Sequence, residues 1–93
     1  MSGMDTEEIS SRLEAAVEKL AALEHERWAH WQRYVHSVGE WQSDGSLVIA
    51  PDLVARWERQ IATPYANLTE AERESDREQV RRYLPVLKAA LAR

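Results

Sequence analysis

With 93 residues, 44% of them hydrophobic and 30% charged, the chain is long enough for one modest core and too short for two domains. The absence of cysteine excludes disulfides and thiolate metal sites, and the net charge of −4 argues against a general nucleic-acid-binding protein, which needs a basic surface. Because no apolar run approaches the roughly 18 residues that cross a bilayer and no secretion signal is visible, we expect a cytoplasmic protein without membrane contact.

The first predicted element is a long amphipathic helix that begins after Asp5 and ends before Gly39, a natural left-handed terminator. Asp5 and Glu8 form a capping-box pattern. As one piece the helix would be about 50 Å long, which is long for a domain of this size. A bend or break near Glu24 is one alternative, and an acidic first half that packs on a partner is another. The apolar residues that recur at three- and four-residue steps are Ile9, Leu13, Ala16, Val17, Leu20, Trp28, Trp31, Val35 and Val38.

Residues 39–50 are predicted to form a small hairpin or an extended loop. Ser43-Asp44-Gly45 is a turn signal, and the short run Leu47-Val48-Ile49 favours β structure. Pro51 suits the first turn of a middle helix. Its inner face is predicted to carry Val54, Trp57 and Ile61.

The last predicted helix follows a break at Thr63-Pro64-Tyr65 and opens with a second capping box, formed by Thr69 and Glu72. Pro85 lacks an N–H and should kink this helix or restart it. The fold class is therefore mostly α: a small helical domain with a long first helix, a short β-hairpin or extended loop, a middle helix and a C-terminal helix kinked at Pro85. We expect the first and last helices to pack antiparallel. The predicted contact sets Trp28, Trp31 and Val35 against Val80, Leu84 and Leu87.

A local basic patch at residues 25–36 lies on an acidic background and suits one small anion better than a polyanion. The three histidines of this patch are five and six residues apart, which does not match the spacing of a helical metal site, so no metal is expected. The sequence has no nucleophile elbow, no glycine-rich phosphate loop and no isolated pair of catalytic carboxylates. We therefore expect a non-enzymatic protein without a cofactor.

His25 and Trp28 are three residues apart and thus neighbours on one helix face. An imidazole beside an indole can hydrogen-bond and stack on a ligand. The alternative, which spacing alone favours, is a core tryptophan beside a satisfied histidine. Four tryptophans and three tyrosines with no phenylalanine suit half-buried surfaces such as ligand clefts and interfaces.

Two further motifs occur in a characteristic order. Segment 20–29 has a leucine-alanine start followed by His25 and Trp28, and Pro64-Tyr65-Ala66-Asn67-Leu68 precedes an acidic helix that contains Asp76-Arg77. Together they resemble the signature of the ryanodine-receptor repeat (RyR) domain, in its single-unit bacterial or phage type. Gly39-Glu40-Trp41 is a looser form of the family's Gly-Trp step, and Ala55 to Thr63 is interpreted as an inserted or extended helix. The resemblance covers about residues 20–87.

The resemblance implies a non-catalytic module that holds a ligand or contacts another protein. Some RyR domains bind adenine nucleotides, so Trp28 would face a base and the basic groups one turn on would face phosphates. The family's arginine one turn after the tryptophan falls on Gln32 here, with Arg33 beside it. We expect a small anionic ligand, such as an adenine nucleotide, a cyclic nucleotide or another nucleotide-derived signal, which a phage or defence protein would sequester. The alternative is a structural protein–protein interaction module with no small ligand.

The expected ligand site lies between the second half of the first helix and the Pro64-Tyr65 turn. Its predicted lining residues are His25, Trp28, Arg33, Tyr65 and Arg77. The aromatic ring would stack on a base, and the arginines would hydrogen-bond with phosphate or carboxylate oxygens.

Residues 1–19 are predicted to form an N-terminal helical arm beside an RyR-like domain of residues 20–93. Within residues 4–24 an apolar stripe must be buried somewhere. A homo-oligomer through this segment is one possibility, and folding back on its own domain is the other. The stripe consists of Ile9, Leu13, Val17 and Leu20.

Overall fold

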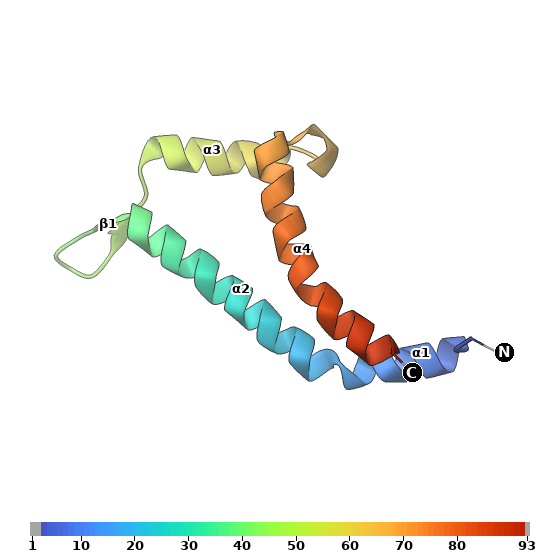
Figure 1. The fold of residues 1–93 in the computed structure, drawn as a ribbon. Coiled ribbons are helices and arrows are strands. Elements are labelled where there is room, and N and C mark those ends of the chain that lie inside the picture. Colours follow the sequence, from blue (N-terminus) through green and yellow to red (C-terminus); the bar gives the residue numbers. More distant parts are fainter. Residues whose placement is uncertain (1–2, 93) are drawn as a thin grey trace.

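The computed structural model describes residues 3–92 and shows a mostly helical chain with one short hairpin (Figure 1). This confirms the predicted fold class. In chain order the elements are α1 (Thr6–Ala15), α2 (Val17–Val38), β1 (Glu40–Trp41), β2 (Leu47–Val48), α3 (Pro51–Ala62), the 3₁₀ turn η1 (Tyr65–Asn67) and α4 (Glu70–Leu91).

The long first helix is divided into α1 and α2 at Ala16, eight residues before the position near Glu24 where we considered a break. The Asp5 side chain caps α1 by accepting a hydrogen bond from the backbone N–H of Glu8 at 2.8 Å. α1 then packs on the C-terminal end of α4, where the Arg12 guanidinium donates to the carbonyl oxygen of Ala92. Ala16 lies at this junction and is the one buried residue in the described part of the chain, at 6% exposure.

The hairpin pairs Glu40 with Val48 and Trp41 with Leu47 in antiparallel register. Its turn requires glycine, since Gly45 has a φ of 89°. Gly39, in contrast, ends α2 in an extended conformation, with φ −82° and ψ 168°, so the expected left-handed terminator is wrong. A Cβ atom at position 39 would lie 2.7 Å from Cγ of Leu47. Glycine is therefore needed there for a close approach between helix and strand.

The capping box predicted at the start of α4 is present in both directions: Thr69 accepts from the Glu72 backbone, and Glu72 accepts from the Thr69 backbone. Glu72 also accepts hydrogen bonds from Arg59 and Gln60, which fastens the end of α3 to the start of α4. α4 then continues through Pro85 as one helix.

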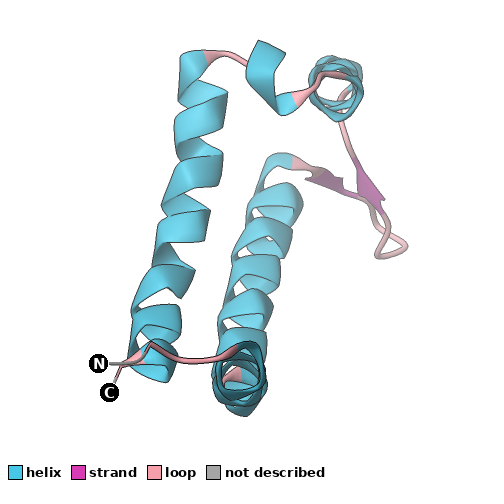
Figure 2. Ribbon diagram, turned by 90° about the vertical axis from the view of Figure 1, so that its right-hand side faces the viewer, coloured by secondary structure: helices cyan, strands magenta, loops and turns pink. Residues whose placement is uncertain are grey.

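α2 and α4 run in opposite directions and approach each other where the N-terminal half of α2 meets the C-terminal half of α4, but they diverge toward α3 (Figures 1 and 2), and residues of the expected apolar contact stay exposed on both helices. Trp28 remains 54% exposed and Val80 60% exposed. The helices are instead joined by polar contacts between the first half of α2 and the second half of α4. Tyr83 donates to Glu24 at 2.7 Å, and Arg82 donates to Glu26 at 2.8 Å. Figure 1 shows that α3 spans the gap between the C-terminal end of α2 and the N-terminal end of α4.

The molecule is open and elongated, with extents of 63 × 33 × 17 Å. Its radius of gyration is 18.7 Å, whereas a compact domain of this length has about 12 Å. The stripe of the N-terminal arm is partly covered within the chain, because Ile9, Leu13 and Leu20 are half-buried, while Val17 stays exposed. None of the helices in residues 3–92 is long and apolar enough to cross a membrane.

Two carboxylates that join helices have pKa values far below the ordinary range. The backbone N–H of Thr69 is the largest cause at Glu72, whose pKa falls from 4.5 to about 2. At Glu24, hydrogen bonds from Arg27 and then Tyr83 lower the pKa from 4.5 to about 2. The folded protein therefore binds these two protons less tightly than the unfolded chain does.

We expect stability that is constant above about pH 4.5 and falls as the pH drops toward 2, because protonation of Glu24 and Glu72 favours the unfolded chain. Urea unfolding followed by circular dichroism across this range measures the loss. The double variant Glu24→Gln/Glu72→Gln should lose less stability between the same pH values than the wild type. Identical acid profiles for the two proteins would contradict the assignment.

Candidate functional site

The histidine–tryptophan pair on α2 forms the ring contact that its spacing predicts. The rings of His25 and Trp28 are stacked, with centroids 6.0 Å apart and planes 25° from parallel. Both side chains are exposed, so the alternative of a core tryptophan is wrong for Trp28. Trp28 remains 54% exposed to solvent beside the histidine ring.

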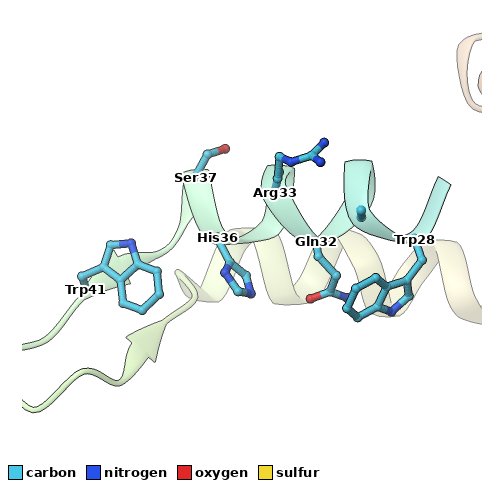
Figure 3. Close-up of a pocket in the computed structure, with 7 residues that line it drawn as sticks. Trp28, Gln32, Arg33, His36, Ser37 and Trp41 are labelled. Carbon is cyan, nitrogen blue, oxygen red and sulfur yellow. The ribbon is translucent and has the colours of Figure 1, made fainter. Parts of the chain in front are cut away.

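A shallow pocket of about 500 Å³ extends from Trp28 along the outer face of α2 to the hairpin. Figure 3 shows Trp28, Gln32 and His36 projecting from one edge of the helix, and Arg33 and Ser37 from the other. Trp41 of β1 closes the end of the pocket, and its ring meets that of His36 edge-on at 5.7 Å. The full lining is Trp28, Ala29, Gln32, Arg33, His36, Ser37 and Trp41.

Arg33 differs from most of the other arginines in its electrostatic surroundings. Every arginine in residues 3–92 except Arg33 and Arg56 is held in a salt bridge. The Arg33 side chain lines the same pocket as the exposed indoles of Trp28 and Trp41, on the helix edge that also carries Ser37 (Figure 3), and no carboxylate neutralises its charge. Its charge is thus available to an anion from solution.

Tyr65 and Arg77 also meet, since the Arg77 guanidinium donates to the Tyr65 hydroxyl at 3.3 Å. The charge of Arg77 is already balanced, however, by Glu74 at 2.8 Å and by Glu70. Glu74 foremost, with Glu70 and the Tyr65 hydroxyl, raises the pKa of Arg77. The charge of Arg77 is therefore neutralised by acidic residues of its own helix, α4.

The five residues predicted for the site therefore form two separate groups. His25, Trp28 and Arg33 lie on the outer face of α2, and Tyr65 and Arg77 lie where η1 meets α4. The pocket that Trp28 and Arg33 line includes neither Tyr65 nor Arg77.

Five lining residues of the outer pocket were missing from the predicted site: Ala29, Gln32, His36, Ser37 and Trp41. Gln32 and His36 follow Trp28 at i+4 and i+8, so helix periodicity alone places them on its face. Trp41 comes from the hairpin, and its position depends on how the chain leaves α2 at Gly39. Helix periodicity could therefore have identified the pocket residues on α2, but nothing in the sequence indicated Trp41.

The arrangement is suited to binding, because it offers flat aromatic surfaces beside an unneutralised cation. Among the described residues, no group of three histidine, aspartate or glutamate side chains gathers closely enough to hold a metal ion. Comparison of the chain with protein-family models, with curated proteins and with solved structures gave no match.

Proposed function

We propose that the protein is a non-enzymatic, cytoplasmic binding module for a small anionic ligand with an aromatic ring, such as a nucleotide or a nucleotide-derived signal. The outer face of α2 is the binding surface. The observation that carries the proposal is that Arg33, an arginine without an acidic partner, lines one pocket together with the exposed indoles of Trp28 and Trp41.

Each half of a nucleotide has a counterpart on this surface. A base stacks on an indole with about 1–3 kcal/mol per base, whatever its identity. A phosphate accepts charge-assisted hydrogen bonds from a guanidinium, which contribute about 1.5–3 kcal/mol. The resemblance to RyR domains supports the same kind of ligand. A protein that binds such a molecule without altering it would act by sequestration.

The test is isothermal titration calorimetry with AMP, ATP and a cyclic nucleotide, and with adenosine and inorganic phosphate as the separate halves. We expect the nucleotides to bind more tightly than either half. Trp28→Ala should weaken nucleotide binding by about 5- to 150-fold, and Arg33→Ala by about 10- to 150-fold. Both side chains are exposed, so the helical circular dichroism signal should persist.

Arg81→Ala is the matched control, because it removes the same charge from an exposed arginine on α4 that is paired with Glu74. Its affinity should stay close to that of the wild type. Absence of nucleotide binding to the wild type would overturn the proposal, as would equal losses in the Arg33 and Arg81 variants. Chromatography should recover the nucleotide intact, and turnover would contradict a purely binding role.

A structural protein–protein interaction module is the second candidate, and the exposed apolar surface supports it. Large apolar patches on a domain are typical of interaction sites. The large apolar side chains with substantial exposure include Trp31, Trp41, Val48, Val54, Ile61, Val80 and Leu84. This candidate predicts that no nucleotide in the calorimetric panel binds.

A further inference from the structure

A second, larger pocket of about 650 Å³ lies on the opposite side of α2, in the space framed by α2, α3 and α4 (Figure 1). Trp31 is one of its lining residues. The Trp31 ring meets Tyr34 at 5.4 Å and meets Trp57 of α3 edge-on at 5.6 Å. We call this pocket the three-helix groove. Its aromatic lining is what the core of a helical domain would contain, yet it remains open.

The apolar face of α3 borders this groove and is only partly covered, since Leu53 and Trp57 are half-buried while Val54 and Ile61 are exposed. Its apolar residues recur along one stripe, from Leu53 and Val54 through Trp57 to Ile61. Ile61 is 77% exposed, more than any other large apolar residue in the described chain. The hydrogen-bonded link from α3 to α4 runs through polar residues, Arg59 and Gln60, so this link leaves the stripe free.

The amount of exposed surface matches what a homodimer needs. The chain exposes 7347 Å², whereas a compact monomer of 10.7 kDa exposes about 5,500 Å². The excess of about 1,800 Å² falls within the roughly 1,000–2,500 Å² that each subunit of an obligate homodimer buries.

Two unpaired charges on the groove are complementary to each other. Arg56 of α3 and Asp76 of α4 both line it, and neither has an ion-pair partner within residues 3–92. In a two-fold symmetric interface, when residue i contacts residue j of the partner, j also contacts i. A second copy would therefore form two ion pairs across the interface, each between Arg56 of one chain and Asp76 of the other.

We infer that a second copy of this chain docks on the three-helix groove, with the two α3 helices packed about a two-fold axis. The Ile61 side chain of each copy enters the apolar space beneath the other's Trp31 and Trp57. The dimer completes a core that a single chain leaves open. This inference uses the opposite face of α2 from the proposed ligand surface and does not rest on ligand binding.

Sedimentation equilibrium of the full chain from about 1 to about 100 µM tests the dimer, a range that brackets micromolar dissociation constants. We expect a dimer for the wild type. Ile61→Asp should raise the dissociation constant by at least about 30-fold, because it places an unpaired carboxylate in the interface. Glu58→Gln, on the polar side of α3, is the control and should leave the dissociation constant unchanged. A wild-type monomer throughout this range would overturn the inference.

A charge-reversal pair makes the test independent of folding effects. Arg56→Asp and Asp76→Arg should each be monomeric alone, because each homodimer would set like charges opposite one another. An equimolar mixture of the two variants should dimerise, because both contacts then join opposite charges. No effect within one chain produces this rescue. A mixture that stays monomeric, or single variants that dimerise as well as the wild type, would show that the interface lies elsewhere.

Discussion

Replacing Pro85 by alanine is expected to raise the free energy of unfolding by about 2–3 kcal/mol, the largest single-residue gain available in α4. Pro85 lies inside a helix that continues to Leu91, so its missing N–H leaves the carbonyl of Arg81 without its i+4 donor. Alanine supplies that donor and removes the clash of the proline ring with the preceding turn. For a chain of this length the melting temperature should rise by about 10–20 °C.

Pro51→Ala is the matched control, because Pro51 occupies the first turn of α3, where a backbone N–H has no intrahelical partner. This variant should be neutral or slightly destabilising. Thermal unfolding of the three proteins at one concentration makes the comparison, since a dimer's melting temperature depends on concentration. A neutral or destabilising Pro85→Ala would mean that the proline is required where it stands, for instance for a bend on which the packing of α4 depends.

The sequence predicted best those features that depend on neighbouring residues. The Asp5 N-cap on the backbone of Glu8 and the capping box of Thr69 with Glu72 are formed, because each needs only a side chain three residues from its partner's backbone. The contact of His25 with Trp28 follows from helical spacing in the same way.

The sequence did not reveal which surface packs against each apolar helix face. Periodicity placed Trp31 and Val80 on apolar faces, but it does not say whether the facing surface belongs to the same chain. α2 and α4 diverge toward α3 (Figure 1), and both residues stay exposed within one chain. Arg77 was assigned to the ligand site with Trp28, yet its charge is balanced within α4 by Glu74, a neighbour at i−3 that the sequence itself contains.

The break between α1 and α2 was misplaced for a related reason. Alanine is the best helix former, so no local rule ends a helix at Ala16. The chain turns there because α1 packs on the end of α4, which is a tertiary contact between residues far apart in sequence. The small side chain of Ala16 lets α1, α2 and α4 approach one another closely at the junction. Helix propensity does not predict this packing role.

Ala16→Leu is therefore expected to lower the free energy of unfolding by about 1–3 kcal/mol, although it adds an apolar side chain to a protein with little core. Ala16 is 6% exposed where α1, α2 and α4 meet, so the added carbons must push α1 away from α4. Ala15→Leu makes the same change at the exposed last residue of α1 and should alter stability by no more than about 0.5 kcal/mol. Urea unfolding measures both, and the slope with denaturant should stay the same if only stability changes. If Ala16→Leu proved as stable as Ala15→Leu, α1 would not be packed at this junction in solution. The apolar stripe of residues 4–24 would then be exposed and able to form the predicted homo-oligomer contact.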